Sequence, residues 1–227
     1  MTNLERFLDT FFNLEVMARY LPSIVDGFLL TAWLAVVIIA TGLVAGLALA
    51  LLRSLQLRPV NWLIVGLVDV CRALPPLVIL IMFYFGLPNI GLRPSGVVSL
   101  WLALSIVLAA FAEEIFWAGI VSVGRGQWEA ARSTGLSFTQ ALGWVVLPQA
   151  LRLTIPPLTN RAIAITKNTA LGSVVAVPEI LTQAQTALSF SYNPSPLTLG
   201  AFAYLILFVP FVALGRWVET RFAWRRQ

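Results

Sequence analysis

Four polar sites lie inside stretches that are otherwise apolar, and their residue types could bind the polar groups of a small solute. A charge in an apolar layer costs several kcal/mol unless it is paired or faces water, so each charged site is a candidate for function. We predict that Arg72 lies beside a solute pathway near a helix break, and that Glu114 meets an ammonium group. The four sites are Arg72, Glu114, Asn160 and the cluster Lys167, Asn168 and Thr169.

Arg72 and Glu114 also have a structural interpretation. Asp69 lies three residues before Arg72 on the same helical face, so these two side chains could form a self-neutralising pair. Glu114 could pair with an arginine at the cytoplasmic boundary of the membrane. Glu113 points about 100 degrees away from Glu114 on a helix, so we expect that the two do not line the same cavity.

The other two sites have alternatives of the same kind. Lys167 could face a pathway together with Asn168 and Thr169, or it could keep its stem in lipid and extend its ammonium group to the interface. Asn160 follows two consecutive prolines. It could line a pocket or bond the backbone groups that the prolines leave unpaired, and we favour the backbone role.

The sequence lacks the residues that most hydrolytic and metal-dependent sites require. It contains no histidine, and Cys71 is its one cysteine. An intrachain disulfide, a His/Cys metal cluster and a Ser-His or Cys-His catalytic pair are therefore excluded. The sequence also has no G-x-x-x-x-G-K-[ST] phosphate loop and no Gly-x-Ser-x-Gly elbow. We expect a chain without enzymatic activity and without a cofactor or metal of its own.

The composition is that of a membrane protein. Of 227 residues, 59% are hydrophobic and only 11% are charged, and the mean hydropathy is +0.88. A soluble domain would carry roughly a quarter charged residues, and a spanning helix needs about 20 mostly apolar ones. Pro75 and Pro76 should break the second of the expected spans. We predict an all-α fold with five transmembrane helices at residues 27–52, 60–87, 97–121, 162–177 and 197–218.

Basic residues set the expected orientation and domain limits. The positive-inside rule places the N-terminus in the periplasm and the C-terminus in the cytoplasm, so the net charge of +5 reflects topology and not nucleic-acid binding. The predicted parts are a periplasmic segment 1–26, a membrane domain 27–218 with a cytoplasmic loop at about 122–161, and a tail 219–227. The inner side would carry Arg53, Arg58, Arg125, Arg132, Arg152, Arg161, Arg216, Arg221, Arg225 and Arg226, against Arg6, Arg19 and Arg93 outside.

The cytoplasmic loop is expected to form two short helices. Residues 127–134 are rich in helix formers and stop at Gly135, the residue type that best accepts a left-handed cap. Ser137 with Gln140 three residues later matches the capping box that starts a second helix, and Pro148 should end that helix. The predicted result is a bent helical knob on the cytoplasmic surface.

The first of these two helices offers a contact surface. Ala130 and Ala131 are small enough for the backbone of another protein to approach, while Glu129 and Arg132 could make charged contacts at the rim. Such a knob would fit a groove on a soluble partner. The alternative, from the residues alone, is an amphipathic helix that lies on the membrane.

The same loop resembles the EAA motif of ATP-binding-cassette importer permeases. Glu129, Ala130, Ala131 and Gly135, followed by Leu147-Pro148, carry this resemblance. Across most of the chain the sequence is similar to the polar amino-acid permeases of the histidine/glutamine type. Several short segments carry this similarity, and their order and spacing along the chain are specific. Those segments are Arg72-Ala-Leu-Pro75, Tyr84-Phe-Gly-Leu-Pro88, Glu114-Ile-Phe-Trp-Ala-Gly-Ile120, Gly126-Gln-Trp-Glu-Ala-Ala131, Leu147-Pro-Gln-Ala150, Ile155-Pro-Pro-Leu-Thr-Asn160 and Lys167-Asn-Thr-Ala-Leu171.

The resemblance implies a mechanism in the bacterial inner membrane. In that family the EAA helix is a coupling helix that sits in a cleft of a cytoplasmic ATPase subunit. Two ATPase subunits, which bind the ATP, drive two identical or paralogous permease chains between inward-open and outward-open forms, and a periplasmic amino-acid-binding protein delivers the solute. The coupling residues would be Gln127, Glu129, Ala130, Ala131, Gly135 and Pro148.

Three departures from the family pattern bear on the solute. Related permeases usually have Arg-Gly-Thr-Pro where this chain has Arg72-Ala-Leu-Pro75, an arginine at Trp117 and a serine at Ala170. The chain therefore either handles a less polar solute than its relatives or is the member of a heteromeric pair that does not hold solute. An ion-coupled secondary amino-acid transporter is the competing function, although we find no repeat that pairs the first two spans with the last two.

Overall fold

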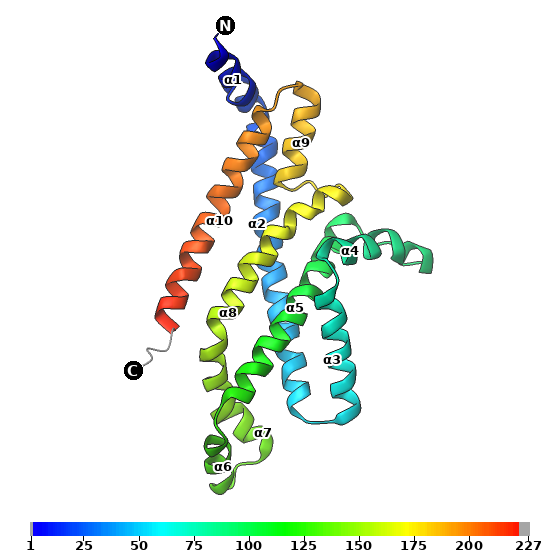
Figure 1. The fold of residues 1–227 in the computed structure, drawn as a ribbon. Coiled ribbons are helices and arrows are strands. Elements are labelled where there is room, and N and C mark those ends of the chain that lie inside the picture. Colours follow the sequence, from blue (N-terminus) through cyan, green and yellow to red (C-terminus); the bar gives the residue numbers. More distant parts are fainter. Residues whose placement is uncertain (1, 223–227) are drawn as a thin grey trace. The chain divides into compact units, whose positions relative to one another are not determined.

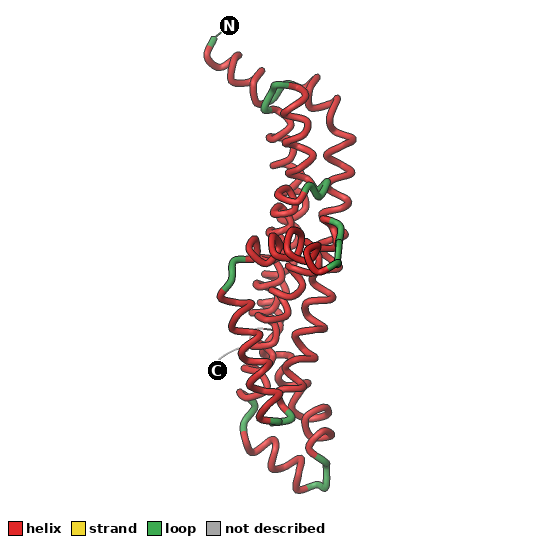
Figure 2. The backbone as a smooth tube through the Cα atoms, turned by 90° about the vertical axis from the view of Figure 1, so that its right-hand side faces the viewer, coloured by secondary structure: helices red, strands yellow, loops and turns green. Residues whose placement is uncertain are grey.

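The computed structural model describes residues 2–222, and every regular element in this range is a helix (Figure 1, Figure 2). The all-α prediction is therefore confirmed for these residues. Arg225 and Arg226 of the predicted tail lie outside the described residues. The α-helices are α1 (Asn3–Phe11), α2 (Leu14–Ser54), α3 (Arg58–Ala73), α4 (Pro76–Ile81), α5 (Gly96–Ser122), α6 (Arg125–Ser133), α7 (Phe138–Ala141), α8 (Leu147–Lys167), α9 (Ile180–Ser191) and α10 (Ser195–Phe222).

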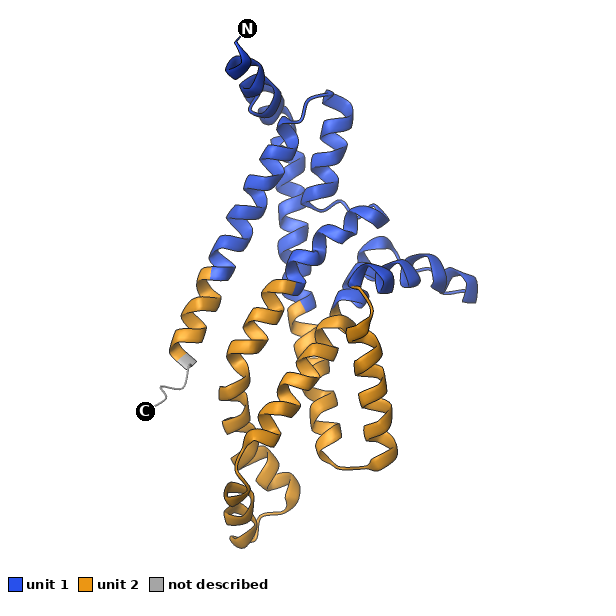
Figure 3. Cartoon of the chain, viewed as in Figure 1, with its two compact units in different colours: residues 1–38, 76–104, 165–212 blue, residues 39–75, 105–164, 213–227 orange. Residues whose placement is uncertain are grey.

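The chain divides into two units, each with its own internal packing (Figure 3). One comprises residues 1–38, 76–104 and 165–212, and the other comprises residues 39–75, 105–164 and 213–227. We call the first the α9 unit and the second the EAA unit. Helices α2, α5, α8 and α10 each contribute residues to both units. Most of the predicted site residues belong to the EAA unit.

Three of the described helices are long and apolar enough to cross a membrane. They are α2 together with α1, then α5 and α10, and they match the first, third and fifth predicted spans. Helices α3 and α4 are a fourth candidate if a bent pair counts as one span. The fourth predicted span, residues 162–177, is not among these candidates, because it holds the end of α8 and a 3-10 helix, Asn168–Val175.

The break in the second predicted span is confirmed. Helix α3 ends at Ala73, and α4 begins at Pro76. Leu74 between them is extended, with φ −83° and ψ 135°, because the ring of a following proline disfavours the helical conformation. Arg72 therefore lies in the last turn of α3, beside the break.

Helix α8 begins at Leu147, where the sequence predicted a loop up to about residue 161. Pro156 and Pro157 lie inside this helix. Each proline removes one N–H donor and so leaves the carbonyl four residues earlier without its helical partner. Those carbonyls belong to Arg152 and Leu153, which are exposed, so partners outside the helix can reach them. The helix consequently continues through both prolines.

Pro148 does not end the second loop helix, and that prediction is also wrong. Helix α7 continues into a π-helical turn, Leu142–Val146, and then into α8. Proline is tolerated in the first turn of a helix, because an N–H group there has no acceptor within the helix. The wider π turn separates Pro148 from α7. The knob formed by α6 and α7 is therefore continuous with α8.

Three further α-helical segments were not predicted: α1, the start of α2, and α9. Helix α2 begins at Leu14 and not at residue 27, because Glu15 and Arg19 in its first turns are compatible with a helix. Helix α9 lies between the last two predicted spans. It is capped by Glu179, whose carboxylate accepts hydrogen bonds from the backbone N–H groups of Leu181 and Thr182 at 2.9 and 2.8 Å.

Within the EAA unit, α2 packs against α5 at a glycine. A Cβ atom added at Gly46 would lie 2.6 Å from the Cβ of Ala112 and 2.8 Å from the carbonyl oxygen of Ala109. Real Cβ atoms do not approach other atoms so closely, so the two helices would have to separate.

We expect Gly46→Ala to destabilise the protein by about 1 to 3 kcal/mol through this overpacking. Gly66 on α3 is the matched control, because an added Cβ there meets nothing within 4 Å. Gly66→Ala should leave stability unchanged or raise it by about 0.5 to 1 kcal/mol, as alanine is the better helix former. The readout is the melting temperature of the purified protein in detergent. Equal values for the two variants would contradict the close approach of α2 and α5.

Candidate functional site

The knob consists of two short helices, as predicted. Helix α6 ends at Ser133, and Gly135 beyond it has φ +87°, a left-handed conformation that glycine adopts without strain. Ser137 and Gln140 form the predicted capping box at the start of α7. The ring of Trp128 on α6 stacks on Phe138 of α7 with centroids 5.3 Å apart, so the two helices support each other.

The predicted coupling residues differ in exposure. Ala131 is buried, with 6% of its surface exposed, so its side chain packs within the chain and offers nothing to a partner. The amide of Gln149 on α8 donates to the side-chain oxygen of Gln127 at 3.2 Å, which ties α6 to α8. The exposed members of the set are Gln127, Glu129, Ala130, Gly135 and Pro148.

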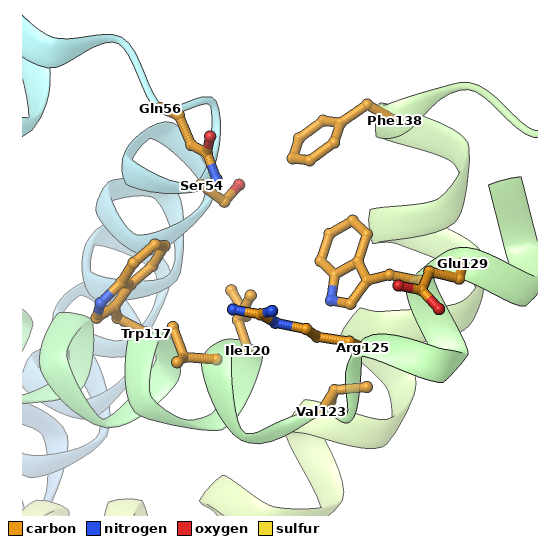
Figure 4. A pocket seen from close by; sticks show the side chains of 10 residues that line it. Ser54, Gln56, Trp117, Ile120, Val123, Arg125, Glu129 and Phe138 are labelled. Atoms are coloured by element: carbon orange, nitrogen blue, oxygen red, sulfur yellow. The ribbon is translucent and has the colours of Figure 1, made fainter.

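A cavity of about 380 Å³ lies beside the knob, within the EAA unit (Figure 4). Three aromatic side chains, Trp117, Trp128 and Phe138, form much of its wall, and the side chain of Arg125 reaches toward its centre. Neither Arg125 nor Glu129 forms an ion pair with another residue in the described part of the chain. The lining residues are Ser54, Gln56, Trp117, Ile120, Val121, Val123, Arg125, Trp128, Glu129 and Phe138.

Glu113 on α5 forms an ion pair with Arg53 near the end of α2. The two carboxylate oxygens lie 3.0 and 3.3 Å from one guanidinium nitrogen, and the Glu113 side chain is fully buried. The guanidinium also lies over the ring of Trp117, 4.6 Å from its centroid. Arg53 therefore joins α2 to α5 at two points, and the sequence analysis did not anticipate this pair.

Glu114 pairs with Arg72 of α3, and Asp69 lies 3.9 Å from the same guanidinium. The predicted pair of Asp69 and Arg72 is therefore present, with Glu114 as a second carboxylate. Glu114 thus pairs with an arginine, as its structural interpretation predicted, but this arginine is Arg72 of α3 and not one at the predicted cytoplasmic boundary. The two neighbouring glutamates point to different helices, as their angular separation predicted.

Arg161 lies over the same aromatic ring as Arg72, although the sequence predicted that Arg161 is in a loop. Its guanidinium lies over the ring of Phe111, 3.7 Å from the centroid, and that of Arg72 lies 5.4 Å from the same ring. A helical stripe could have revealed α8 and hence the position of Arg161. That stripe consists of the buried residues Ala150, Thr154, Leu158, Ala162 and Ile165.

The remaining predicted site residues do not join this group. The amide of Asn160 donates to the carboxylate of Glu219 on α10, so its favoured role of bonding the proline backbone is wrong. Lys167, Asn168 and Thr169 belong to the α9 unit. Lys167 is exposed, and Thr169 is buried and donates to the carbonyl of Thr166. No group of acidic, histidine or cysteine side chains between residues 2 and 222 could hold a metal ion.

The sequence and the fold both match known transport proteins. Residues 42–224 match the family described as binding-protein-dependent transport system inner membrane component. A probable glutamine ABC transporter permease protein of Bacillus subtilis, GlnM, is 36% identical over 92% of this chain and 97% of its own length. The glutamate/aspartate import permease protein GltK of Escherichia coli is 32% identical over 77% of this chain and 82% of its own.

Solved structures show the same similarity. A chain from the crystal structure of an amino acid ABC transporter with histidines superposes with a TM-score of 0.82 at 31% identity, covering 90% of this chain and 96% of that chain. A chain of the MetNI methionine ABC transporter in an inward-facing conformation has a TM-score of 0.69 at 21% identity, covering 87% and 95%, and supports the fold alone. With a family match over most of its length, this chain belongs to the binding-protein-dependent transport system inner membrane components.

Proposed function

We propose that this chain is the permease subunit of an ATP-binding-cassette importer that moves polar amino acids, or related amines and derivatives, across the bacterial inner membrane. The observation that carries the proposal is the family match over residues 42–224. Relatives named as amino-acid permeases, which align with nearly the whole chain, support the solute class. The chain itself would catalyse no reaction and bind no cofactor.

The proposed complex contains two permease chains, identical or paralogous. Two ATPase subunits would bind the ATP on the cytoplasmic side, and an amino-acid-binding protein would deliver the solute on the periplasmic side. We propose five spans, with α8 and the following 3-10 helix as the fourth, and an N-terminus outside. The surface for the ATPase would be the exposed side of α6, which carries Gln127, Glu129 and Ala130.

The solute pathway would include the charged group around Phe111. The Arg72 side chain is 31% exposed, and a guanidinium carries five N–H donors. A carboxylate of the solute would accept a charge-assisted hydrogen bond from an exposed N–H that does not bond Glu114 or Asp69. Glu114, with 47% of its side chain exposed, would bind an ammonium group. Asn160 in the EAA unit, and Lys167, Asn168 and Thr169 in the α9 unit, remain separate candidates for contact with the solute.

Reconstitution tests the proposed function against the competing one. The chain, its ATPase, its permease partner and the binding protein are placed in proteoliposomes, and uptake of labelled glutamine is measured. We expect uptake that requires ATP and the binding protein and that persists without an ion gradient. Uptake driven by a sodium or proton gradient, in liposomes that lack the ATPase, would instead establish a secondary transporter.

We expect Glu114→Gln to raise the KM for uptake of an amino acid by about tenfold, because one charge-assisted hydrogen bond to the solute is lost. Glutamine keeps the size of the side chain, so the effect reports the lost charge. The measurement is the concentration dependence of ATP-driven uptake in proteoliposomes.

Asp69→Asn is the matched control for this variant. It also removes a carboxylate beside Arg72, but the Asp69 side chain is 66% exposed and its nearest oxygen is 3.9 Å away, so KM should change little. Unchanged uptake kinetics in both variants would favour a heteromeric pair in which the partner permease, and not this chain, holds the solute.

A further inference from the structure

Helix α1 has one apolar face and one polar face. The rest of the described chain does not bury the apolar face. None of its residues is buried. Leu4, Phe7, Leu8 and Phe11 recur at the spacing of one helical face, with 66%, 52%, 47% and 39% of their surfaces exposed. The opposite face carries Glu5, Arg6, Asp9 and Thr10.

The helix is well formed despite its short length. Thr2 and Glu5 form a reciprocal capping box at its start, with hydrogen bonds of 2.8 and 3.2 Å. The ring of Phe7 lies 5.1 Å from that of Phe11 and 6.2 Å from that of Phe12. Phe7 and Phe11 therefore place two neighbouring rings on the apolar face of α1, and Phe12, just beyond its end, adds a third beside Phe7.

The C-terminal end of α1 is fastened to the turn between α9 and α10. Ser195, which is buried, accepts a hydrogen bond from the backbone N–H of Asn13 at 2.9 Å and donates to the carbonyl of Thr10 at 3.3 Å. The amide of Asn193 donates to the carbonyl of Asp9 at 3.0 Å. All of these residues belong to the α9 unit, and Figure 1 shows α1 beside the start of α10. The direction of α1 is therefore fixed within that unit.

We propose that α1 lies in the headgroup layer of the membrane, with its aromatic face against the acyl chains, and that Ser195 holds it there. The end of α1 is bonded to Ser195, the first residue of α10. Helix α10 is long and apolar enough to span the bilayer, so this end of α1 lies near a membrane boundary. Short helices with one apolar and one charged face bind that layer by apolar insertion, and aromatic rings are enriched there.

The charge of α1 indicates which force would hold it in the membrane. Glu5 and Asp9 against Arg6 give the helix one net negative charge, so attraction to anionic headgroups contributes nothing to its binding. Insertion of the apolar face is then the driving force, and it should be the same in neutral and anionic bilayers. This inference does not depend on which solute the transporter carries.

Spin labels test the position of α1 in the assembled transporter, reconstituted in nanodiscs. Single cysteines replace Leu4 and Leu8 on the apolar face, or Arg6 and Thr10 on the polar face, in a Cys71→Ala background. We expect the apolar pair to be accessible to oxygen and shielded from a water-soluble nickel chelate, and the polar pair to show the reverse. The pattern should be the same in phosphatidylcholine alone and with added phosphatidylglycerol.

Two results would overturn the proposal. Shielding of Leu4→Cys and Leu8→Cys from both reagents would mean that protein covers this face, for example a second permease chain. Access of the nickel chelate to both would mean that α1 lies in water. Neither result would bear on ATP-driven uptake, so the proposed function is tested separately.

The role of Ser195 is tested by the mobility of the label at Leu8. Ser195→Ala removes both of its side-chain hydrogen bonds to the α1 end, and the spectrum should become that of a more mobile label. Ser189→Ala is the control, since Ser189 is exposed and bonds only the carbonyl of Gln185 within its own helix. An unchanged spectrum in Ser195→Ala would show that α1 is held by lipid alone.

Discussion

Replacing Arg53 with methionine is expected to lower the free energy of unfolding by about 3 to 5 kcal/mol, since it leaves a buried carboxylate unpaired. Glu113 is fully buried, and its hydrogen bonds in the described structure come from Arg53. Methionine keeps much of the apolar stem of arginine, so the loss reports the charge and not a cavity. The measurement is unfolding by SDS in mixed micelles.

Two companion variants make this result specific. Arg53→Met together with Glu113→Leu removes both charges, and it should recover most of the lost stability because no charge remains buried. Arg58→Met, at the exposed start of α3, should change stability by no more than about 0.5 kcal/mol. A double variant as unstable as Arg53→Met alone would show that the ion pair is not the cause.

The same ion pair bears on coupling. Trp117, which lies beneath the Arg53 guanidinium, lines the cavity beside α6, and so does Ser54, the residue after Arg53. Arg53 and Glu113 therefore hold together the ends of α2 and α5 that form one wall of this cavity. In the Arg53→Met variant we expect ATP-driven uptake to fall further than the amount of folded protein does.

Local sequence signals predicted the parts of the fold that depend on a few neighbouring residues. The capping box at Ser137, the left-handed Gly135 and the proline break after Arg72 each follow from chemistry within one or two turns, and the structure has all three. The angular separation of Glu113 and Glu114 is equally local. Such features depend little on the rest of the chain, which explains why the sequence was sufficient.

The errors arose where tertiary packing outweighs local preference. Prolines at 148, 156 and 157 suggested a loop, but the buried stripe of α8 keeps those residues helical. The pair of Arg53 and Glu113 joins residues 60 positions apart, and no spacing rule connects them. Arg161 was missed for the same reason, since its place over Phe111 follows from the course of α8.

The substitution Glu129→Arg, on the exposed side of α6, is expected to release the ATPase subunit from the transporter. Glu129 is exposed and has no ion-pair partner among residues 2–222, so its charge is available to another protein. Placing like charges against each other at an interface costs several kcal/mol. An ATPase that contacts Glu129 should therefore lose at least about tenfold in affinity. Glu129→Gln, which keeps the size, is the mild control.

The two alanines of the motif separate coupling from folding in the same experiment. Ala130 is exposed and Ala131 is buried. We expect Ala130→Trp to abolish co-purification of the ATPase at an unchanged melting temperature, because the added ring blocks the docking face. Ala131→Trp should lower the melting temperature itself, since the ring does not fit inside the chain. Normal ATPase binding and normal uptake in both Glu129→Arg and Ala130→Trp would exclude α6 as the coupling helix.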